Sequence, residues 1–568
     1  MVLSDRLDRW GRGWRGPLAA AILALIAGLP GLIALPPLDR DESRFAEASA
    51  QMLESGDFVS IDFQETPRFK KPVGVYWLQA AAVAGLSHVE DRHIWAYRIP
   101  SLLGAMLAAA ACAWGAGAFL RAGSAMLAGG MLGTSFMLST EAGIAATDGV
   151  LCGAVTLAMA ALGRMYLASR GGPPAGRLTK ALFWAAFALS VLVKGPIGPM
   201  VVGLTLLSLC LWDRRVRWLK DLGWGWGLIL LAAVVGPWAL AITVATDGAF
   251  WGSAVAGDLA PKLIGEQEGH GAPPGFYAVL APLLLFPAAL LAPAGLAAGW
   301  RARAEPAVRF ALCWLVPTWL VFEIVPTKLV HYTLPAYGAL AWLMARALEA
   351  KPGAEGAQAL GRTSRRLGAA LVLLAAVAFA AAGPAAMAKL SDWSGAPWAL
   401  IAGVLYLAAG GVGATLLWRG RPRRALIIAG ALAVTAHGVL AAALAPSLRP
   451  LWLSSRAASA LDRAGISPSQ GVTPGPVTVA GYQEPSLVFL LGADTELGDG
   501  QDAAAAVTEG RPAIVEAHEE GAFRAALGAR GGQVKPAGLI AGLDYSTNRH
   551  DILRLYRPLA PAASSGPS

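Results

Sequence analysis

Cysteine is scarce in this sequence. The chain has four among 568 residues, and each lies within an apolar run: Cys112, Cys152, Cys210 and Cys313. A thiol in such surroundings behaves as a small hydrophobic side chain. The cysteines therefore imply no disulfide framework, which excludes the class of small, disulfide-rich secreted domains.

Nucleotide-binding motifs are also lacking, and charge is sparse. The chain has no P-loop and no G-x-G-x-x-G motif that follows a predicted strand, and charged residues make up only 15% of it. Chemistry driven by a soluble nucleotide is therefore not expected. Many transporters consist of two halves related by an internal repeat. This sequence shows no such repeat.

Apolar residues, in contrast, are abundant. They form 56% of the chain, and the mean hydropathy is +0.53, which soluble domains rarely reach. A transmembrane helix needs roughly 20 apolar residues. The sequence thus predicts an all-α polytopic membrane protein with about thirteen spans. These lie near residues 17–35, 99–120, 124–140, 147–168, 180–194, 196–212, 224–246, 275–299, 310–326, 331–348, 367–388, 397–418 and 425–445.

The basic residues indicate how the chain crosses the membrane. A net charge of +9 could suit nucleic acid, but the basic residues cluster in short loops, as they do on the cytoplasmic side of membrane proteins. If the apolar run 72–86 stays in the membrane interface, every later cluster of basic residues lies on the cytoplasmic side. If that run crosses the membrane, these clusters lie on the opposite side. We adopt the first alternative. It predicts a bacterial inner-membrane protein with its C-terminus in the periplasm and no nucleic-acid partner.

Two domains are expected. Residues 1–446 form the transmembrane domain, with a first periplasmic loop at 36–98. After residue 446 the apolar runs shorten to strand length, with helical patterns between them, so residues 447–568 are predicted to form a small periplasmic α/β domain. Within the first loop, Phe45, Ala48 and Met52 share one face, which predicts a surface helix over residues 41–55.

Polar groups that could carry chemistry fall on one side of the membrane in this topology. They are Asp41, Arg44, Lys70 and Lys71 of the first loop; Asp148 between the third and fourth spans; Glu266, Glu268 and His270 in the segment 247–275; and Lys328, His331 and Tyr332 in the turn 326–335. An active site on that face would need such a concentration of carboxylates and histidines.

Each group also has a purely structural interpretation. Asp148 could cap its span, and Lys328 and His331 could extend to the membrane interface. The E-x-E-x-H spacing that ends at His270 could be a solvated loop or a metal site. The cations of the first loop could touch lipid head groups or bind a phosphate. A sugar linked to polyprenyl phosphate would suit all three features. Its apolar tail matches the spans, its phosphate the cations and its sugar the carboxylates.

The first loop resembles a known family. The stretch DESRFAEASAQMLESGDF, followed by PRFKKPVGVYWLQ, is similar to the first periplasmic loop of GT-C glycosyltransferases of the aminoarabinose (lipid A) transferase and protein mannosyltransferase superfamily. TDG at 147–149, VKGPIG at 193–198, GHGAPPGFY at 269–277 and PTKLVHYTLPAY at 326–337 look like later motifs of that family. The resemblance covers roughly residues 17–350.

The resemblance implies roles for individual residues. Asp41 and Asp148 would be the catalytic carboxylates, and Arg44, Lys71 and Lys328 would bind the donor phosphate. The other residues implied to line the substrate cavity are Glu42, Lys70, Tyr76, His270, His331 and Tyr332.

One residue departs from the family pattern. Family members often have an acid directly before the K-P lysine, where it can help to bind a divalent metal, but here that position is Lys70. A cation repels a cation, so we expect no required metal or other cofactor, with a divalent ion kept as the alternative.

The predicted function is a membrane glycosyltransferase. A monomeric enzyme in contact with membrane lipids would transfer a sugar from polyprenyl phosphate to a periplasmic acceptor, lipid A or another glycolipid. The cations would neutralise the leaving phosphate, and Asp41 would be the general base for a hydroxyl acceptor. The alternatives are a protein O-mannosyltransferase and, in another class, a flippase or transporter of lipid-linked sugars.

Overall fold

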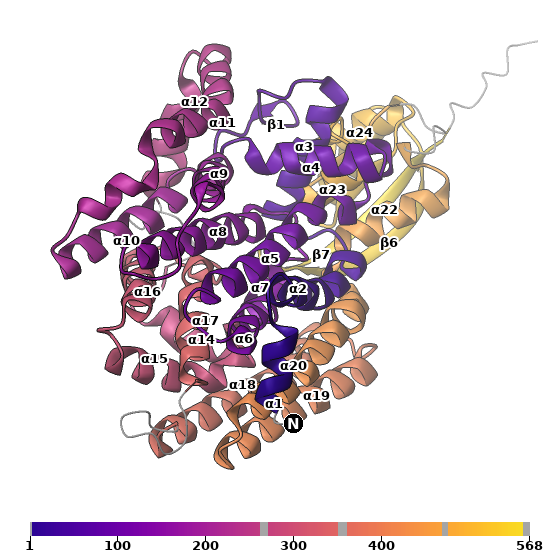
Figure 1. Cartoon of the computed structure of the whole chain (residues 1–568). Helices are drawn as coiled ribbons and strands as arrows, with labels where there is room; N and C mark the ends of the chain where they lie inside the picture. The colour runs from indigo at the N-terminus through magenta and orange to yellow at the C-terminus, as the bar shows by residue number, and fades with distance from the viewer. Residues whose placement is uncertain (1–2, 262–270, 350–359, 469–474, 560–568) are drawn as a thin grey trace, which may run out of the picture.

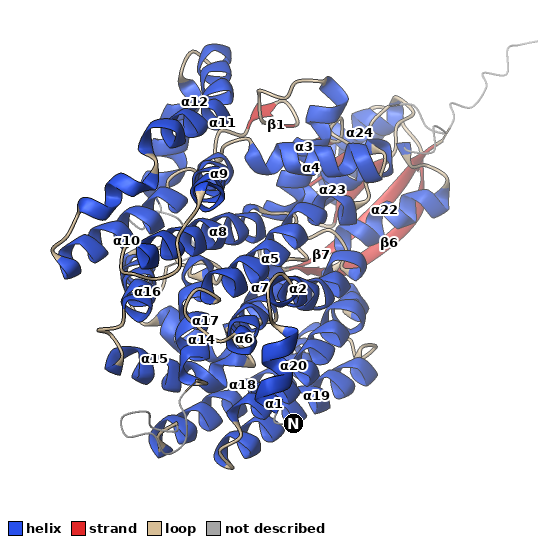
Figure 2. Cartoon of the chain, in the orientation of Figure 1, coloured by secondary structure: helices blue, strands red, loops and turns tan. Residues whose placement is uncertain are grey.

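The computed structural model describes residues 3–261, 271–349, 360–468 and 475–559. Helices dominate it, and the larger of its two sheets lies in the C-terminal region (Figures 1 and 2). The first helices are α1 (Leu3–Trp10), α2 (Arg15–Ala34), α3 (Asp41–Ser55), α4 (Gly74–Leu86), η1 (Val89–Asp91), α5 (Ile94–Ala116), α6 (Ala122–Gly133), α7 (Phe136–Glu141), α8 (Thr147–Ala168), α9 (Arg177–Lys194), α10 (Ile197–Asp213), η2 (Arg217–Leu222), α11 (Trp224–Ala245), α12 (Ala249–Gly252) and η3 (Ser253–Leu259).

The second half of the transmembrane part is again helical. Its elements are α14 (Phe276–Leu284), η4 (Ala288–Leu291), α15 (Ala292–Arg301), α16 (Pro306–Ile324), α17 (Leu334–Ala347), α18 (Arg362–Leu390), α19 (Ala396–Trp418), α20 (Pro422–Val439), η5 (Leu440–Leu444) and α21 (Ala445–Ser447).

Among the described residues, eight helices are long and apolar enough to cross a membrane, namely α2, α5, α8, α11, α16, α18, α19 and the continuous run α20–α21. A ninth span is possible if α14 and η4–α15, bent by 115°, count as one. Each of the thirteen predicted spans falls on helix, but four do not meet the criterion of length and composition. Helices α6, α10 and α17 have 12, 17 and 14 residues, and α9 carries three basic residues.

Helix α8 occupies the centre of the bundle. Its apolar window is 89% buried, whereas that of α11 is only 11% buried and faces outward. Glycines let α8 approach α5 closely, because a Cβ on Gly104 would lie 2.4 Å from the carbonyl oxygen of Gly149. A Cβ on Gly153 would likewise lie 2.5 Å from the carbonyl oxygen of Gly104. This packing fixes the first turn of α8, which carries Asp148.

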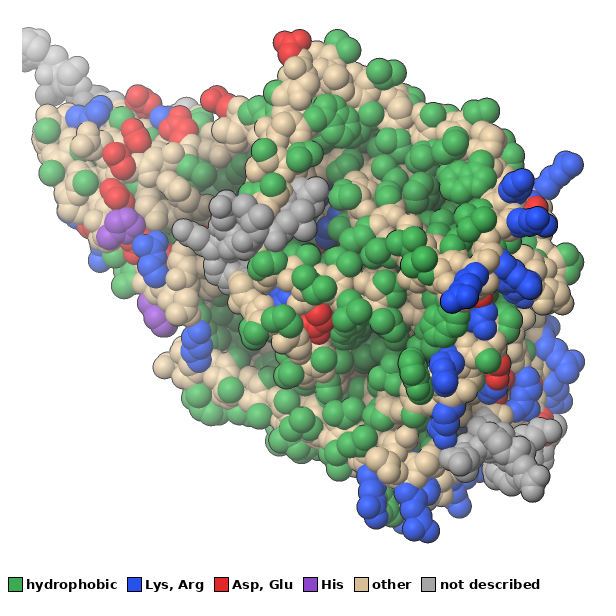
Figure 3. All heavy atoms as spheres, turned by 90° about the vertical axis from the view of Figure 1, so that its left-hand side faces the viewer, with side chains coloured by type: hydrophobic (Ala, Val, Ile, Leu, Met, Phe, Trp, Pro, Cys, Tyr) green, Lys and Arg blue, Asp and Glu red, His purple; other side chains and the backbone are tan. Residues whose placement is uncertain are grey.

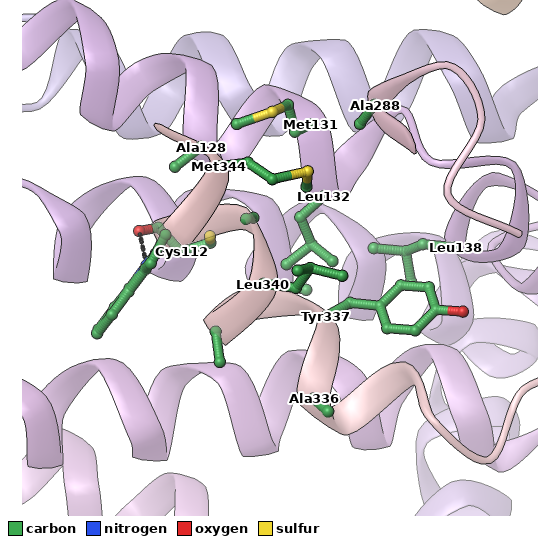
Figure 4. Close-up of a cluster of buried hydrophobic side chains, with 14 of the residues drawn as sticks. Cys112, Ala128, Met131, Leu132, Leu138, Ala288, Ala336, Tyr337, Leu340 and Met344 are labelled. Atoms are coloured by element: carbon green, nitrogen blue, oxygen red, sulfur yellow. Dashed lines mark hydrogen bonds between the residues drawn. The ribbon is translucent and has the colours of Figure 1, made fainter. Parts of the chain in front are cut away.

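The hydrophobic core extends through the middle of the helical bundle. Figure 4 shows part of it, where Met131 and Leu132 of α6 lie near Leu340 and Met344 of α17. Cys112 is buried there, and its carbonyl oxygen accepts a hydrogen bond from the indole of Trp342 at 2.9 Å. All four cysteines are free, as their apolar surroundings predict.

The surface is divided by charge. In Figure 3 a broad hydrophobic area separates a region rich in Lys and Arg, at the right, from a region at the left where Asp and Glu gather. A bundle of apolar helices with basic residues concentrated at one end is the asymmetry that the positive-inside rule describes. The chain is a multi-pass membrane protein.

A buried ion pair holds the first loop against the bundle. Glu42 of α3 accepts two hydrogen bonds from Arg98 of α5, each 2.8 Å long, and both side chains are almost fully buried. Glu42 also accepts from the backbone N–H groups of Leu38 and Ala145. The loop continues through a short β-hairpin, β1 (Asp62–Phe63) and β2 (Thr66–Pro67), into α4, which packs on α3 and α5.

The C-terminal region is a mixed α/β unit, as predicted. Its five-stranded sheet has the order β4-β3-β5-β7-β6, with β3 parallel to β4 and β5 and the other pairs antiparallel. The strands are β3 (Thr478–Ala480), β4 (Glu496–Gly498), β5 (Ala513–Glu516), β6 (Val534–Asp544) and β7 (Arg549–Pro558). The helices are η6 (Arg449–Leu451), α22 (Leu453–Ala464), α23 (Pro485–Leu491), α24 (Gly500–Thr508) and α25 (Glu520–Ala529).

This region packs directly on the first loop, as Figure 1 shows for α3 and α23. Gln64 donates hydrogen bonds to the carbonyl oxygens of Ala493 and Thr495. Asp39 accepts a hydrogen bond from the Ser486 hydroxyl, and its N–H donates to the Tyr545 hydroxyl at 2.7 Å. The C-terminal region thus supports the segment that precedes Asp41.

Candidate active site

Asp148 lies at the centre of a group of charged side chains. The Lys194 ammonium, at the end of α9, donates to Asp148 Oδ1 at 2.6 Å, and His331 Nε2 lies 3.6 Å from Oδ2. Glu141, the last residue of α7, lies 3.3 Å from the other ring nitrogen of His331. Burial alone would lower the pKa of His331, but the carboxylates of Asp148 and Glu141 raise it above its ordinary value.

A cavity of about 420 Å³ opens beside this group. Its charged lining comes from Lys70, Lys71, Asp148 and Lys194, and the Tyr332 ring lies 5.5 Å from the Lys194 ammonium. The remaining lining is mainly apolar and includes Pro72, Leu151, Ile197, Met200, Phe250, Trp251, Val255, Val321, Phe322, Val325 and Pro335. A polar end joined to an apolar wall suits a lipid that carries an anionic head group.

The helix α4 brings the lysines of the first loop to this cavity. A Cβ on Gly74 would lie 2.6 Å from the carbonyl oxygen of Leu192, so the start of α4 packs directly on the last turn of α9. Phe69, just before the two lysines, packs edge-on against Phe250 at 5.6 Å between ring centroids. Lys70 and Lys71 therefore reach the cavity that Lys194 lines.

Asp41 and Arg44 belong to a separate group at the start of α3. Asp41 is 71% exposed, and its carboxylate lies 3.5 Å from Arg68. Arg44 is half-buried, and burial, followed by the charge of Arg68, lowers its pKa. Neither Asp41 nor Arg44 is among the described residues that line the cavity. Asp41 and Asp148, for which the resemblance implies catalytic roles, thus lie in two different groups of side chains.

Two residues predicted to line the substrate cavity are packed elsewhere. Glu42 is 2% exposed and holds the buried pair with Arg98. Tyr76 is fully buried, and its ring packs on Phe45 at 5.3 Å. Both residues thus belong to the core of the first loop, and their place in the substrate cavity stays a prediction.

Lys328 likewise has a structural role. The prediction makes it a phosphate ligand, but its ammonium donates to the carbonyl oxygens of Phe322, Glu323 and Val325, at 3.2, 2.9 and 2.6 Å. These are carbonyl groups at the C-terminal end of α16, which lack partners within the helix. Lys328 is 5% exposed and caps this helix.

His270, Glu266 and Glu268 lie outside the described residues. A different set has the composition of a cation site, because Glu141, Asp148 and His331 bring ligand-capable atoms within 4.8 Å of one another. Two carboxylates and an imidazole suit a divalent ion. The Lys194 ammonium pairs with Asp148 and competes with such an ion for this carboxylate. The absence of a metal requirement stays a prediction.

Two members of the site were not singled out by sequence reasoning. Lys194 lies in VKGPIG, which the sequence analysis compares with a family motif without giving its lysine a role. Glu141 follows the predicted third span directly, as a lone acid at the end of an apolar run. Both are ionisable residues at the edge of a predicted span, and this feature could have identified them as candidate site residues.

Comparisons with known proteins define the class. Residues 32–249 match the family described as dolichyl-phosphate-mannose-protein mannosyltransferase. The chain has the fold of the crystal structure of ArnT from Cupriavidus metallidurans bound to undecaprenyl phosphate, with a TM-score of 0.75 and 19% identity, over 97% of this chain and 99% of that one. The apo structure of the same protein gives 0.72. The chain thus has the fold of ArnT, and its N-terminal part matches the family that the resemblance in its first loop indicates.

The chain is also similar in sequence to bacterial aminoarabinose transferases. The chain is 32% identical over 358 residues to undecaprenyl phosphate-alpha-4-amino-4-deoxy-L-arabinose arabinosyl transferase of Pseudomonas paraeruginosa. It is 30% identical over 350 residues to a transferase of the same name, numbered 1, from Sodalis glossinidius. The first match covers 61% of this chain and 64% of that relative, and the second covers 60% and 59%. The chain therefore spans less than two thirds of the length of these relatives.

Proposed function

We propose that the protein is an inner-membrane glycosyltransferase that transfers 4-amino-4-deoxy-L-arabinose from undecaprenyl phosphate to lipid A on the periplasmic side. The observation that carries this proposal is the cavity in which Lys70, Lys71 and Lys194 face an apolar wall beside Asp148. The relatives named for this transfer and the ArnT fold support it.

The chemistry of the cavity suits departure of a lipid phosphate. An acceptor oxygen forms a bond to C1 of the sugar while the bond from C1 to the phosphate oxygen breaks, and the electron pair leaves with undecaprenyl phosphate. Lysine ammonium groups stabilise the charge that develops on that phosphate. Asp148, held by Lys194 and His331, provides a fixed carboxylate for the positive charge that builds up on the sugar.

The start of α3 supplies the second part of the proposed reaction. The Asp41 side chain is 71% exposed although it pairs with the buried Arg68 at 3.5 Å, so its carboxylate is accessible to an acceptor. With a hydroxyl acceptor, Asp41 takes the proton as general base. With a phosphate group of lipid A as acceptor no base is needed, and Asp41 orients the acceptor instead.

Mass spectrometry of glycolipids tests the proposal. A strain that lacks the gene should lose the mass increment of one aminopentose on lipid A, and the wild-type gene should restore it. A Lys71→Ala gene, expressed to the same level, should not restore it. An unchanged lipid A profile in the deletion strain, together with loss of hexose from periplasmic glycoproteins, would contradict the proposal and favour a protein mannosyltransferase.

A further inference from the structure

A second cavity lies in the C-terminal region, between α22 and β6, and shares no lining residue with the candidate active site. Its volume is about 600 Å³, within the range of ligand-binding sites. Arg449, Arg456 and Arg463 line one side of it, and Leu539 lies on the other.

The three arginines form a row. They are seven residues apart, which is close to two helical turns, so Arg456 and Arg463 lie on one face of α22 and Arg449 continues the row at η6. Arg456 donates to the carbonyl oxygen of Ala541 on β6 at 2.8 Å, which holds its guanidinium across the groove. Arg463 is exposed and donates no hydrogen bond to any residue that the structure describes.

The positive charges of this row are not paired with carboxylates at salt-bridge distance. Within the described ranges, none of the three guanidinium groups forms a salt bridge. Asp392, in the loop after α18, is the carboxylate whose charge acts on Arg449 and Arg456. Burial, followed by the like charge of Arg449, lowers the pKa of Arg456. An anion in the groove would relieve this repulsion.

The groove begins where the last apolar helix ends. The apolar run of α20–α21 stops at Ser447, two residues before Arg449. Leu448 and Leu543 pack with Met387 and Leu390 at the end of α18, so the sheet region is seated on the ends of the spans. Leu539, beside the arginines, is 62% exposed. An arginine row that starts at a membrane surface, with an apolar side chain next to it, matches an amphiphilic anion.

We propose that this groove binds the phosphate head group of an anionic membrane lipid, and so holds the C-terminal region on the bilayer. Guanidinium groups bind phosphate oxygens in pairs of parallel hydrogen bonds, which gives arginine an advantage over lysine at such sites. Leu539 contacts the apolar part of the lipid next to the phosphate. The inference does not depend on the sugar transfer proposed above.

Binding of a short-chain lipid tests this inference on the full-length protein in a neutral detergent. The probe is dihexanoyl-phosphatidic acid, with dihexanoyl-phosphatidylcholine as the zwitterionic comparison. We expect saturable binding of phosphatidic acid that weakens about 10-fold in Arg463→Gln, because one charge-assisted contact is lost. Arg456→Gln should act in the same direction, and Leu539→Ser should also weaken binding.

Arg530→Gln is the matched control, since Arg530 is an exposed arginine of the same region outside the groove. It should bind the lipid as the wild type does, and both Arg530→Gln and Arg463→Gln should keep the wild-type unfolding temperature, because both arginines are exposed. Equal loss in Arg463→Gln and Arg530→Gln would contradict the assignment to this groove. Displacement of the lipid by inorganic phosphate at equal concentration, with no effect of Leu539→Ser, would show a site for free phosphate and overturn the lipid assignment.

Discussion

Asp148 and Asp41, the two carboxylates predicted to be catalytic, occupy contrasting surroundings. The Asp148 side chain is 9% exposed and contacts Lys194 and His331, while the Asp41 side chain is 71% exposed with Arg68 at 3.5 Å. A buried carboxylate that pairs with a lysine ammonium contributes to stability as well as to the electrostatics of a site. An exposed carboxylate contributes little to stability and is accessible to a substrate. The two groups therefore differ in what their removal should change.

The largest expected effect is on stability. Asp148→Asn leaves the Lys194 ammonium without its carboxylate in a buried setting, which should lower the free energy of unfolding by about 3–5 kcal/mol. Asp41→Asn should change it by less than about 0.5 kcal/mol. Thermal unfolding of both variants in the same detergent measures the difference. Equal stability of the two variants would contradict the buried ion pair.

The next effect is on donor affinity. Lys71→Ala removes one of the cations of the cavity and should weaken binding of undecaprenyl phosphate about 10-fold or more. Lys328→Met should leave that affinity unchanged, although it should lower stability, because Lys328 caps α16. Titration of purified protein with undecaprenyl phosphate separates the two. A larger loss in Lys328→Met than in Lys71→Ala would restore Lys328 as the phosphate ligand.

The sequence predicts the class, the helical segments and the family because each depends on local signals. Apolar runs identify the helices, and the D-E-x-R and K-P motifs identify the first loop. It does not predict that Glu42 forms an ion pair with Arg98, which lies 56 residues further along the chain. It also misses the contact of Lys194 with Asp148, 46 residues apart. Such contacts depend on how helices pack, which no short motif encodes.

The junction between the first loop and the C-terminal region should respond to pH. Burial raises the pKa of Asp39 to about 6, above its ordinary value of 3.8. The folded state therefore binds more protons than the unfolded chain between these values, and stability falls as pH rises from about 4 to about 6. Asp39→Asn should remove this part of the fall. Unfolding temperatures of both proteins from pH 4 to pH 8 measure it, and parallel curves would contradict the buried acid.

The smallest expected effect concerns metal ions. Lys70 and Lys194 line the cavity, so chelation with EDTA should leave most of the sugar transfer intact. Activity before and after chelation, with and without added Zn²⁺ or Mn²⁺, provides the measurement. Complete loss that one metal restores would contradict this prediction and would point to Glu141, Asp148 and His331 as its ligands.

Sugar transfer by purified protein tests the central claim most directly. Wild-type protein, supplied with undecaprenyl phosphate-linked 4-amino-4-deoxy-L-arabinose and lipid A, should add the aminopentose to lipid A and release undecaprenyl phosphate. Asp41→Asn should retain the fold and lower turnover by roughly 100-fold, as loss of a group that acts in the transition state does. Transfer by Asp41→Asn at the wild-type rate, or no transfer by the wild-type protein, would contradict the account.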